Sequence, residues 1–410
     1  MPIEDVENIG RYRPEGYHPI VIGDRLHDRY DIVHKLGFGS YSTTWLARDI
    51  ERKKYVAIKI SISEVNLHES KILKSLSRPD PNVKGQLGNA LVISILDKFR
   101  PDGPNGKHKC FVTEPGMMSL AETKYASYTR LFQLPVARAI MAQVIQAIVF
   151  LHHRGIVHAD LHTGNIVLRL LESIDSLSPE QLYEQYGRPN LEPIVRLDNQ
   201  ALPIGVPSQG AVPIWLGKAS EQVTLSEAKI FLTDFGESFQ PSTTRRHYSN
   251  TPAILVPPEV YFLPQEPVSF PADIWTLTCT LWDIVGQRPL FEGLNPSQDW
   301  MIKEHVDTLG KLPPPDWWRV WDARQIWFTE GVKRTSERSR RSLADRFINS
   351  VQEPRQEHMV ESIAEDEKAC LLTQSKAMLE FRPHERPTAA EIMESEWMVN
   401  WALPELAKQD

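Results

Sequence analysis

The interpretation of this chain rests on one stretch of sequence, His158-Ala159-Asp160-Leu161-His162-Thr163-Gly164-Asn165. An aspartate in such a loop can accept the proton of an attacking hydroxyl, and an asparagine five residues on can reach a divalent metal. A second stretch, Thr233-Asp234-Phe235-Gly236, follows the apolar run 230–232 and predicts a carboxylate that binds Mg²⁺. Either stretch alone could be an ordinary turn, but their order and spacing together favour phosphoryl transfer.

Two upstream segments fit the same chemistry. A glycine-containing hairpin between two predicted strands would let backbone N–H groups close over phosphates, and it consists of Leu36, Gly37, Phe38, Gly39, Ser40, Tyr41, Ser42, Thr43 and Thr44. Ala57 and Lys59 lie on the strand that follows, and Glu69 lies on the next amphipathic segment. A Lys59–Glu69 ion pair would hold the ammonium group against nucleotide phosphates.

Composition limits the classes of function. A net charge of −7 argues against a general nucleic-acid or membrane-surface binder. The three cysteines are odd in number and widely spaced, so neither a disulfide framework nor a thiolate metal site is expected. No run approaches the ~18 apolar residues that cross a bilayer, and we expect a protein of the cytoplasm, the nucleus or both.

Periodicity predicts an α+β architecture. Residues 29–60 alternate as short antiparallel strands, residues 64–77 read as a helix, and a four-residue apolar step predicts a buried helix over 135–153. The chain from Pro271 onward looks mainly helical. We therefore expect two lobes that share a cleft, a small antiparallel-sheet lobe with one main helix and a larger, mainly helical lobe.

These motifs resemble those of eukaryotic protein kinases from near residue 17 to near residue 400, and most of all a divergent, fungal-type member of the serine/arginine-rich protein kinases of the CMGC group. Three further stretches carry the resemblance: Tyr17 to Asp24, Pro257-Pro258-Glu259, and His305 to Pro313. The 74 positions between Asp160 and Asp234 resemble the family's interrupted kinase domain. The likeness implies a bilobal protein-kinase fold and a buried pair between Glu259 and Arg386.

The resemblance also implies a division of the chain and a set of site residues. The expected parts are an N-terminal extension 1–28, an N-lobe 29–114, a C-lobe 115–400 with a spacer at about 172–226 and a charged insert at about 332–366, and a tail 401–410. ATP and Mg²⁺ would be the cofactors. Thr113, Glu114 and Gly116 would form the adenine-binding hinge, Asn165 and Asp234 would bind the metal, and Asp160 would be the catalytic base beside Lys59 and His162.

Three departures from the family pattern affect what the resemblance implies. Ser42 stands where a third glycine is usual, a change that adds only a small side chain. Ala159 replaces the arginine that receives an activation-loop phosphate, so we expect activity without loop phosphorylation. His162 replaces the lysine that steadies the transferred phosphoryl group. Histidine is mostly neutral at pH 7, and we expect His162 to donate a hydrogen bond to that group or to Asp160.

The function implied is ATP-dependent phosphorylation of serine or threonine, with arginine/serine-rich proteins as substrates and a monomeric enzyme that binds neither nucleic acid nor membrane directly. Asp299, Glu304 and Asp307 could grip a basic substrate, or could form a solvated helix face. The run Arg338 to Ser342 could mimic a substrate, and we favour a charged loop. A pseudokinase scaffold and a small-molecule phosphotransferase, some of which use a histidine in this loop, remain the alternatives.

Overall fold

The computed structural model describes residues 4–63, 68–78, 87–170, 174–329 and 341–409. It divides into two compact units. Residues 1–78, 93–118 and 169–217 form the sheet unit, and residues 79–92, 119–168 and 218–410 form the helical unit.

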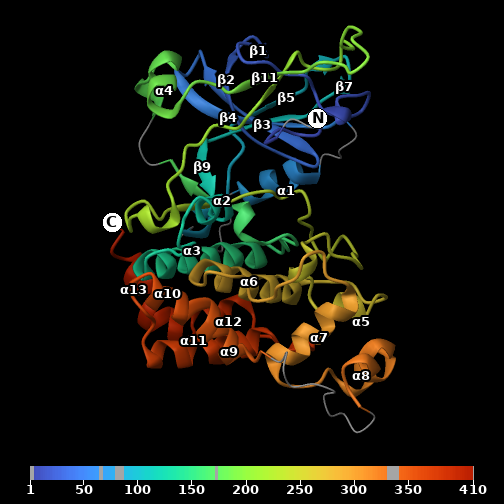
Figure 1. Ribbon diagram of the computed structural model, residues 1–410, viewed down its shortest axis with the longest axis vertical. Helices are drawn as coiled ribbons and strands as arrows, with labels where there is room; N and C mark the ends of the chain where they lie inside the picture. The colour runs from blue at the N-terminus through green and yellow to red at the C-terminus, as the bar shows by residue number, and fades with distance from the viewer. Residues whose placement is uncertain (1–3, 64–67, 79–86, 171–173, 330–340, 410) are drawn as a thin grey trace. The chain divides into compact units, whose positions relative to one another are not determined.

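The sheet unit is built on a six-stranded antiparallel sheet with the order β1-β2-β3-β4-β8-β5 (Figure 1). Its strands are β1 (Arg25–Leu26), β2 (Tyr30–Gly39), β3 (Ser42–Asp49), β4 (Lys54–Ser61), β5 (Asp97–Phe99) and β8 (Cys110–Thr113). The strands form because β-branched residues such as Ile32, Val56 and Ile58 favour extended backbone, and their side chains, on one face of the sheet, are buried in a common core. Helix α1 (His68–Leu76) follows β4, and β6 (Asp102–Gly103) pairs with β7 (Gly106–Lys107).

The segment predicted as a spacer, 172–226, contributes to the core of the sheet unit. Residues 169–217 group with the sheet, although the expectation counted them with the C-lobe. Within them lie α4 (Pro179–Tyr186) and the pair β11 (Leu191–Pro193) and β12 (Gln209–Ala211). Leu182, Ile214 and Leu216 are buried against Val33 and Leu46 of the sheet. The stretch expected as a spacer therefore contributes these apolar residues to the core, and their burial stabilises the unit.

The helical unit is organised around two long helices, α3 and α6, which pack against each other (Figure 1). Its helices are α2 (Leu120–Tyr125), α3 (Leu134–His153), α5 (Glu259–Phe262), α6 (Phe270–Val285), α7 (Gln298–Leu309), α8 (Pro315–Val320), α9 (Leu343–Phe347), α10 (Glu353–Glu357), α11 (Glu365–Met378), α12 (Ala389–Met393) and α13 (Leu403–Leu406). Its strands are β10 (Ile166–Arg169) and β13 (Ile230–Leu232), and β9 (Gly116–Ser119) lies where the units join in sequence. This division confirms the predicted α+β fold.

Helix α3 is long and apolar enough, by length and composition, to cross a membrane. The sequence analysis did not expect such a stretch. In the structure 78% of its apolar window is buried, and the helix forms the core of its unit. Pro135 occupies its first turn, and Gly155, with φ +69°, follows its end in the left-handed region.

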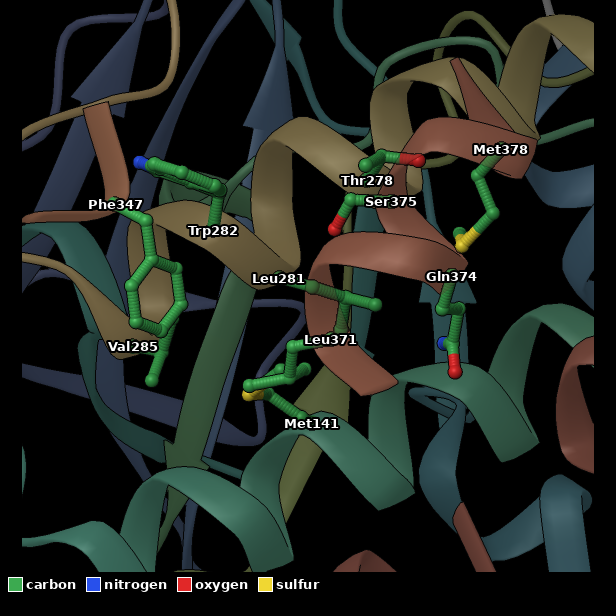
Figure 2. A pocket seen from close by; sticks show the side chains of 10 residues that line it. All are labelled: Met141, Thr278, Leu281, Trp282, Val285, Phe347, Leu371, Gln374, Ser375 and Met378. Carbon is green, nitrogen blue, oxygen red and sulfur yellow. The ribbon is translucent and has the colours of Figure 1, made fainter. Parts of the chain in front are cut away.

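A small cavity lies inside the helical unit (Figure 2). Side chains from four helices line it, among them Met141 of α3, Trp282 of α6, Phe347 of α9 and Leu371 of α11. Its volume is about 20 Å³, enough for a single water molecule. A cavity of this size is a packing defect and cannot hold a nucleotide.

The predicted charged insert, 332–366, is partly helical. Residues 330–340 lie outside the described part of the chain, and with them most of the Arg338 to Ser342 run. Further along, Arg346 and Arg355 are almost completely buried. Arg355 donates to the carbonyl of Val285 at 2.9 Å, and Arg346 donates to Glu304 at 2.5 Å. These two arginines can lie in the core because buried acceptors bind most of their guanidinium N–H groups, although Nε of Arg355 has no hydrogen-bond partner among the described residues.

Candidate active site

The glycine-rich segment forms the β2–β3 hairpin of the sheet unit. Gly37 pairs with Thr44 and Gly39 with Ser42, and Ser40 and Tyr41 form the turn. A Cβ atom at Gly37 or Gly39 would meet no described atom within 4 Å. Packing inside the unit therefore does not require these glycines, and their backbone is open to a ligand such as a phosphate.

The predicted ion pair between strand β4 and helix α1 is present. The Lys59 ammonium lies 2.9 Å from Oε1 and 3.1 Å from Oε2 of Glu69. Both side chains are only partly exposed, at 24% for Lys59 and 14% for Glu69. Partial burial strengthens the pair and fixes the ammonium group at a defined place on the sheet.

The residues predicted for the adenine hinge lie at the end of β8. Thr113 pairs with Ala57 of β4, so two residues expected at the adenine pocket are neighbours in one sheet. Glu114 follows directly, and its carboxylate lies 3.5 Å from Arg169. Gly116 begins β9.

The catalytic loop of the helical unit places Asp160 and Asn165 together. The Asn165 amide nitrogen donates to the backbone carbonyl of Asp160 at 2.8 Å and to its Oδ2 at 3.2 Å. The other carboxylate oxygen, Oδ1, is buried and has no hydrogen-bond partner among the described residues. A buried acceptor without a donor is costly, so Oδ1 is the atom that a substrate hydroxyl would satisfy.

The loop that carries Asp234 meets the same place through a short sheet. Strands β10 and β13 are antiparallel, with Ile166 opposite Leu232. Asn165 directly precedes β10 and Thr233 directly follows β13, so the two residues lie at the same end of the sheet. The Asn165 carbonyl accepts the Thr233 N–H at 2.9 Å. This pairing brings Asn165 and Asp234, the two predicted metal-binding residues, to one end of the sheet.

His162 has a defined orientation. Its Nδ1 accepts the Gly164 N–H at 3.1 Å, so the proton of the neutral ring resides on Nε2. Nε2 lies 3.7 Å from Oδ1 of Asp160. This separation is too long for a hydrogen bond, yet it directs the ring N–H toward the space beside the carboxylate.

A residue to which the sequence analysis gave no role holds the catalytic loop. Asp273, in the first turn of α6, accepts the N–H groups of His158 at 2.7 Å and Ala159 at 2.9 Å. Its Oδ2 also lies 3.0 Å from Nε2 of His152. Burial opposes ionisation of Asp273, but the bonds from His152 and Ala159 outweigh it and lower its pKa. The sequence offered one sign of this role, since Asp273 is a carboxylate within an otherwise mainly apolar helical segment.

Two residues beside the reacting groups have left-handed backbones. Ala159 has φ 65° and Asp234 has φ 56°. Non-glycine residues rarely adopt this region, and each costs of order 1 kcal/mol. Asp273 stabilises the strained turn at Ala159 through its bond to the Ala159 N–H.

A second brace reaches the loop from the far end of α6. Asp283 accepts the Thr163 hydroxyl at 2.6 Å and the Lys124 ammonium at 2.7 Å. Burial raises the pKa of Asp283, but the Lys124 cation more than offsets this and lowers it. The sequence analysis missed Lys124 and Asp283, since nothing in their local pattern indicates that they meet.

The predicted pair between Glu259 and Arg386 is bidentate, with N–O distances of 2.8 and 2.6 Å. The Arg386 side chain is fully buried. Because both partners are desolvated, removing either would leave an unpaired buried charge.

The acidic residues expected to grip a basic substrate are engaged within the protein. Glu304 and Asp307 are buried, and Lys303 lies 2.9 Å from each of them. Arg346 neutralises Glu304 as well. Asp299 is half-buried and accepts the indole N–H of Trp321 at 2.8 Å. Neither possibility raised from the sequence, a grip on a basic substrate or a solvated helix face, holds for Glu304 and Asp307, because both are buried and internal cations take up their charge.

Among the described residues no group of three or more His, Cys, Asp and Glu side chains could hold a metal by itself. Asn165 and Asp234 offer one amide oxygen and one carboxylate at one end of a sheet. Since the Asn165 amide nitrogen donates to Asp160, the amide oxygen remains for a cation. Such a set suits Mg²⁺, which is usually bound by one or two protein oxygens together with substrate phosphates.

The chain is similar to known protein kinases in sequence and in fold. A protein kinase domain model matches residues 30–174. A serine/threonine protein kinase of Aspergillus fumigatus is 24% identical over 397 residues, which cover 93% of this chain and 88% of that relative. A kinase-domain crystal structure shares the fold with a TM-score of 0.60 and 18% identity, over 93% of this chain and 98% of that one.

Two further relatives are more similar over a shorter stretch. The serine/threonine-protein kinase spk-1 of Caenorhabditis elegans is 36% identical over 173 residues, which are 41% of this chain and 17% of spk-1. Human SRSF protein kinase 3 is 35% identical over 171 residues, which are 40% of this chain and 30% of that protein. The chain therefore contains a match to the protein kinase domain over residues 30–174 and is similar to serine/threonine protein kinases, the SRSF protein kinases among them.

Proposed function

We propose that this protein transfers the γ-phosphoryl group of ATP, with Mg²⁺, to serine or threonine hydroxyls of proteins, and that arginine/serine-rich proteins are among its substrates. One observation carries the reaction type. Oδ1 of Asp160 is a buried acceptor that receives no hydrogen bond from the residues the structure describes, and it lies in the same loop as Asn165, beside the β10–β13 sheet that ends at Asp234. A hydroxyl donated to Oδ1 would satisfy the carboxylate and be oriented for attack.

Each part of the chain has a task in this reaction. ATP supplies the phosphoryl group and Mg²⁺ neutralises its charge. The Lys59 ammonium, fixed by Glu69, offers a positive charge to phosphate oxygens. Asn165 and Asp234 offer oxygen ligands, and Asp160 accepts the proton of the substrate hydroxyl.

His162 fits a supporting role. Its ring proton is on Nε2 and directed toward Asp160 Oδ1, so a phosphoryl oxygen entering this space could accept it. A neutral donor stabilises transition-state charge less than an ammonium does, which predicts a slow kinase. Retention of Lys59, Glu69, Asp160, Asn165 and Asp234 argues against a scaffold without activity.

Support for arginine/serine-rich substrates comes from the names of the relatives, and not from an acidic cluster on α7. Glu304 and Asp307 are neutralised internally. If such substrates are used, carboxylates elsewhere must recognise their arginines.

The test is transfer of labelled phosphate from ATP to an arginine/serine repeat peptide, with and without Mg²⁺. The Asp160→Asn variant, which keeps the shape of the side chain, is the control and should lose turnover. A peptide with lysine in place of arginine tests recognition of the guanidinium group. Equal labelling of the peptide by wild type and Asp160→Asn would reject the reaction, and nucleotide binding without any turnover would favour the scaffold. Preferential labelling of an amino alcohol would favour the small-molecule alternative.

A further inference from the structure

The segment that precedes the sheet is held against the sheet unit by buried polar groups. Glu7, Tyr12 and Tyr17 are 3%, 5% and 3% exposed. The two tyrosine rings lie 5.5 Å apart and pack with Ile62 in a small cluster. Polar side chains are ordinarily exposed unless they have buried partners, so this much burial calls for a reason.

The first contact is a buried ion pair beneath the glycine-rich hairpin. The Lys35 ammonium binds the Glu7 carboxylate, which also accepts the Tyr12 hydroxyl. Lys35 is fully buried, and its ammonium lies 5.1 Å from the ring centre of Phe38 and 5.5 Å from that of Trp45. Phe38 belongs to the hairpin itself. Without Glu7 the charge of Lys35 would be buried without a counterion, which is strongly unfavourable.

The second contact reaches the glycine residues. The Tyr17 hydroxyl donates to the carbonyl of Gly39 at 2.7 Å. The open surroundings of Gly37 and Gly39 leave few side-chain contacts to hold this part of the hairpin. A hydrogen bond to Gly39 therefore restricts a backbone that glycine otherwise leaves free to move.

The same segment is fixed at its other side. The Asn105 amide nitrogen donates to the carbonyls of Tyr17 and Gly205, at 2.7 Å each. The Glu15 N–H donates to the Asn105 carbonyl at 2.7 Å, and the Glu15 carbonyl accepts the Ser63 N–H at 3.1 Å. The position of Tyr17 is therefore set by Asn105 of the β6–β7 hairpin, which is itself bound to Gly205 of the segment 172–226. Both belong to the sheet unit.

We propose that residues 7–17 form a brace that positions the glycine-rich hairpin for nucleotide, with Tyr17 as a positioning residue through Gly39 and Glu7 as a second one through Lys35. The inference rests on the proposed function, since the hairpin is taken to close over ATP. Release of the brace lets the hairpin sample more conformations, and ATP then binds more weakly because the hairpin must be ordered on binding. The effect falls on the affinity for ATP more than on the chemical step.

Tyr17→Phe removes only the hydroxyl and is the primary variant. Its matched control is Tyr183→Phe, because the Tyr183 hydroxyl also donates to a carbonyl of β2, that of Val33, at 2.8 Å. Loss of one such bond should raise both the Kd and the KM for ATP about 2- to 10-fold in Tyr17→Phe, with kcat nearly unchanged. Both variants should lower the melting temperature of the protein by similar amounts, but Tyr183→Phe should leave the Kd and the KM for ATP unchanged.

Hydrogen exchange of residues 36–44, measured without nucleotide, gives a readout that is independent of activity. Exchange should quicken in Tyr17→Phe and not in Tyr183→Phe. Glu7→Gln should also quicken the exchange of residues 36–44. If Glu7→Gln does not fold, the double variant Glu7→Leu with Lys35→Met, which removes both buried charges, can be measured instead.

Unchanged exchange and unchanged ATP affinity in Tyr17→Phe would overturn the brace, and so would equal effects in Tyr17→Phe and Tyr183→Phe. Failure of the proposed function would look different. The wild-type chain would then transfer no phosphate from ATP to the peptide, whereas the exchange of the hairpin would still respond to Tyr17→Phe if the brace exists.

Discussion

Asp273 offers the sharpest test of how the fold supports the reaction. In Asp273→Asn the side chain keeps its shape, but one of its two acceptor oxygens becomes an NH₂ donor. The N–H groups of His158 and Ala159 bond to different oxygens of Asp273, so one of them would face this donor. An unsatisfied buried N–H costs about 1–3 kcal/mol, and the remaining bonds lose the help of the charge. We expect a total loss of about 3 kcal/mol in the free energy of unfolding.

Part of this loss should appear in catalysis. The bond to Ala159 stabilises a left-handed residue directly before Asp160, so its loss lets the carboxylate of Asp160 leave its position. Each 1.4 kcal/mol of lost orientation costs tenfold in rate, and we expect kcat to fall about 10- to 100-fold. The measurement is single-turnover phosphotransfer at a temperature at which the variant is fully folded by circular dichroism.

Glu367→Gln is the matched control. Glu367 is a buried carboxylate of the same unit, bound to Arg138 at 2.9 and 2.5 Å and to the Trp397 indole at 3.2 Å. None of these partners of Glu367 belongs to the loop 158–165. Glu367→Gln should therefore lower the free energy of unfolding about as much as Asp273→Asn does and leave kcat unchanged. If Asp273→Asn is destabilised as expected and yet retains the wild-type kcat, the role given to Asp273 is wrong.

Three further predictions concern His162, the activation segment and acid stability. His162→Ala should slow the chemical step with little change in the KM for ATP, and His162→Lys should restore or exceed the wild-type rate; unaltered single-turnover rates in His162→Ala would exclude the donor role. Phosphatase treatment should leave activity intact, because Ala159 stands in place of the arginine that would bind a phosphate on the activation segment. Within that segment Arg246 already pairs with Glu237 at 3.0 Å. A loss of activity after the treatment would refute this prediction. Burial lowers the pKa of His305 to about 3, so below about pH 6.5 the unfolded chain binds a proton that the folded chain does not. Stability should therefore fall by up to about 1.4 kcal/mol per pH unit between pH 6 and pH 4 from this residue. Urea unfolding of His305→Phe, whose ring suits the site between Trp275 and Phe291, should show a shallower pH slope, and an identical slope would count against it.

Sequence reasoning reached those parts of the site that lie close together in the chain. Asp160 and Asn165 share one loop, and the strand before Asp234 and the helix that carries Glu69 have clear periodicities. The prediction of a pair between Glu259 and Arg386 came from family resemblance, because no local pattern links residues so far apart.

The sequence reasoning failed where tertiary contacts change the meaning of a local pattern. Prolines and polar residues in 172–226 suggested a spacer, but a few apolar side chains such as Leu182 and Ile214 suffice to bury it on the sheet. The carboxylates of α7 suggested a binding surface, but Arg346, distant in sequence, reaches Glu304 and neutralises it. Periodicity cannot report such partners, since it describes one element at a time.

The division of the chain has a consequence for how the protein can be cut or assembled. The polypeptide passes between the two units five times, at residues 78, 92, 118, 168 and 217. No fragment taken from one end therefore contains one whole unit without part of the other. A piece ending near residue 118 would lack residues 169–217, and the apolar surface around Val33 and Leu46 would be left in water. The sheet unit can therefore be expected to fold only after residue 217 has left the ribosome, and the helical unit only near the end of synthesis.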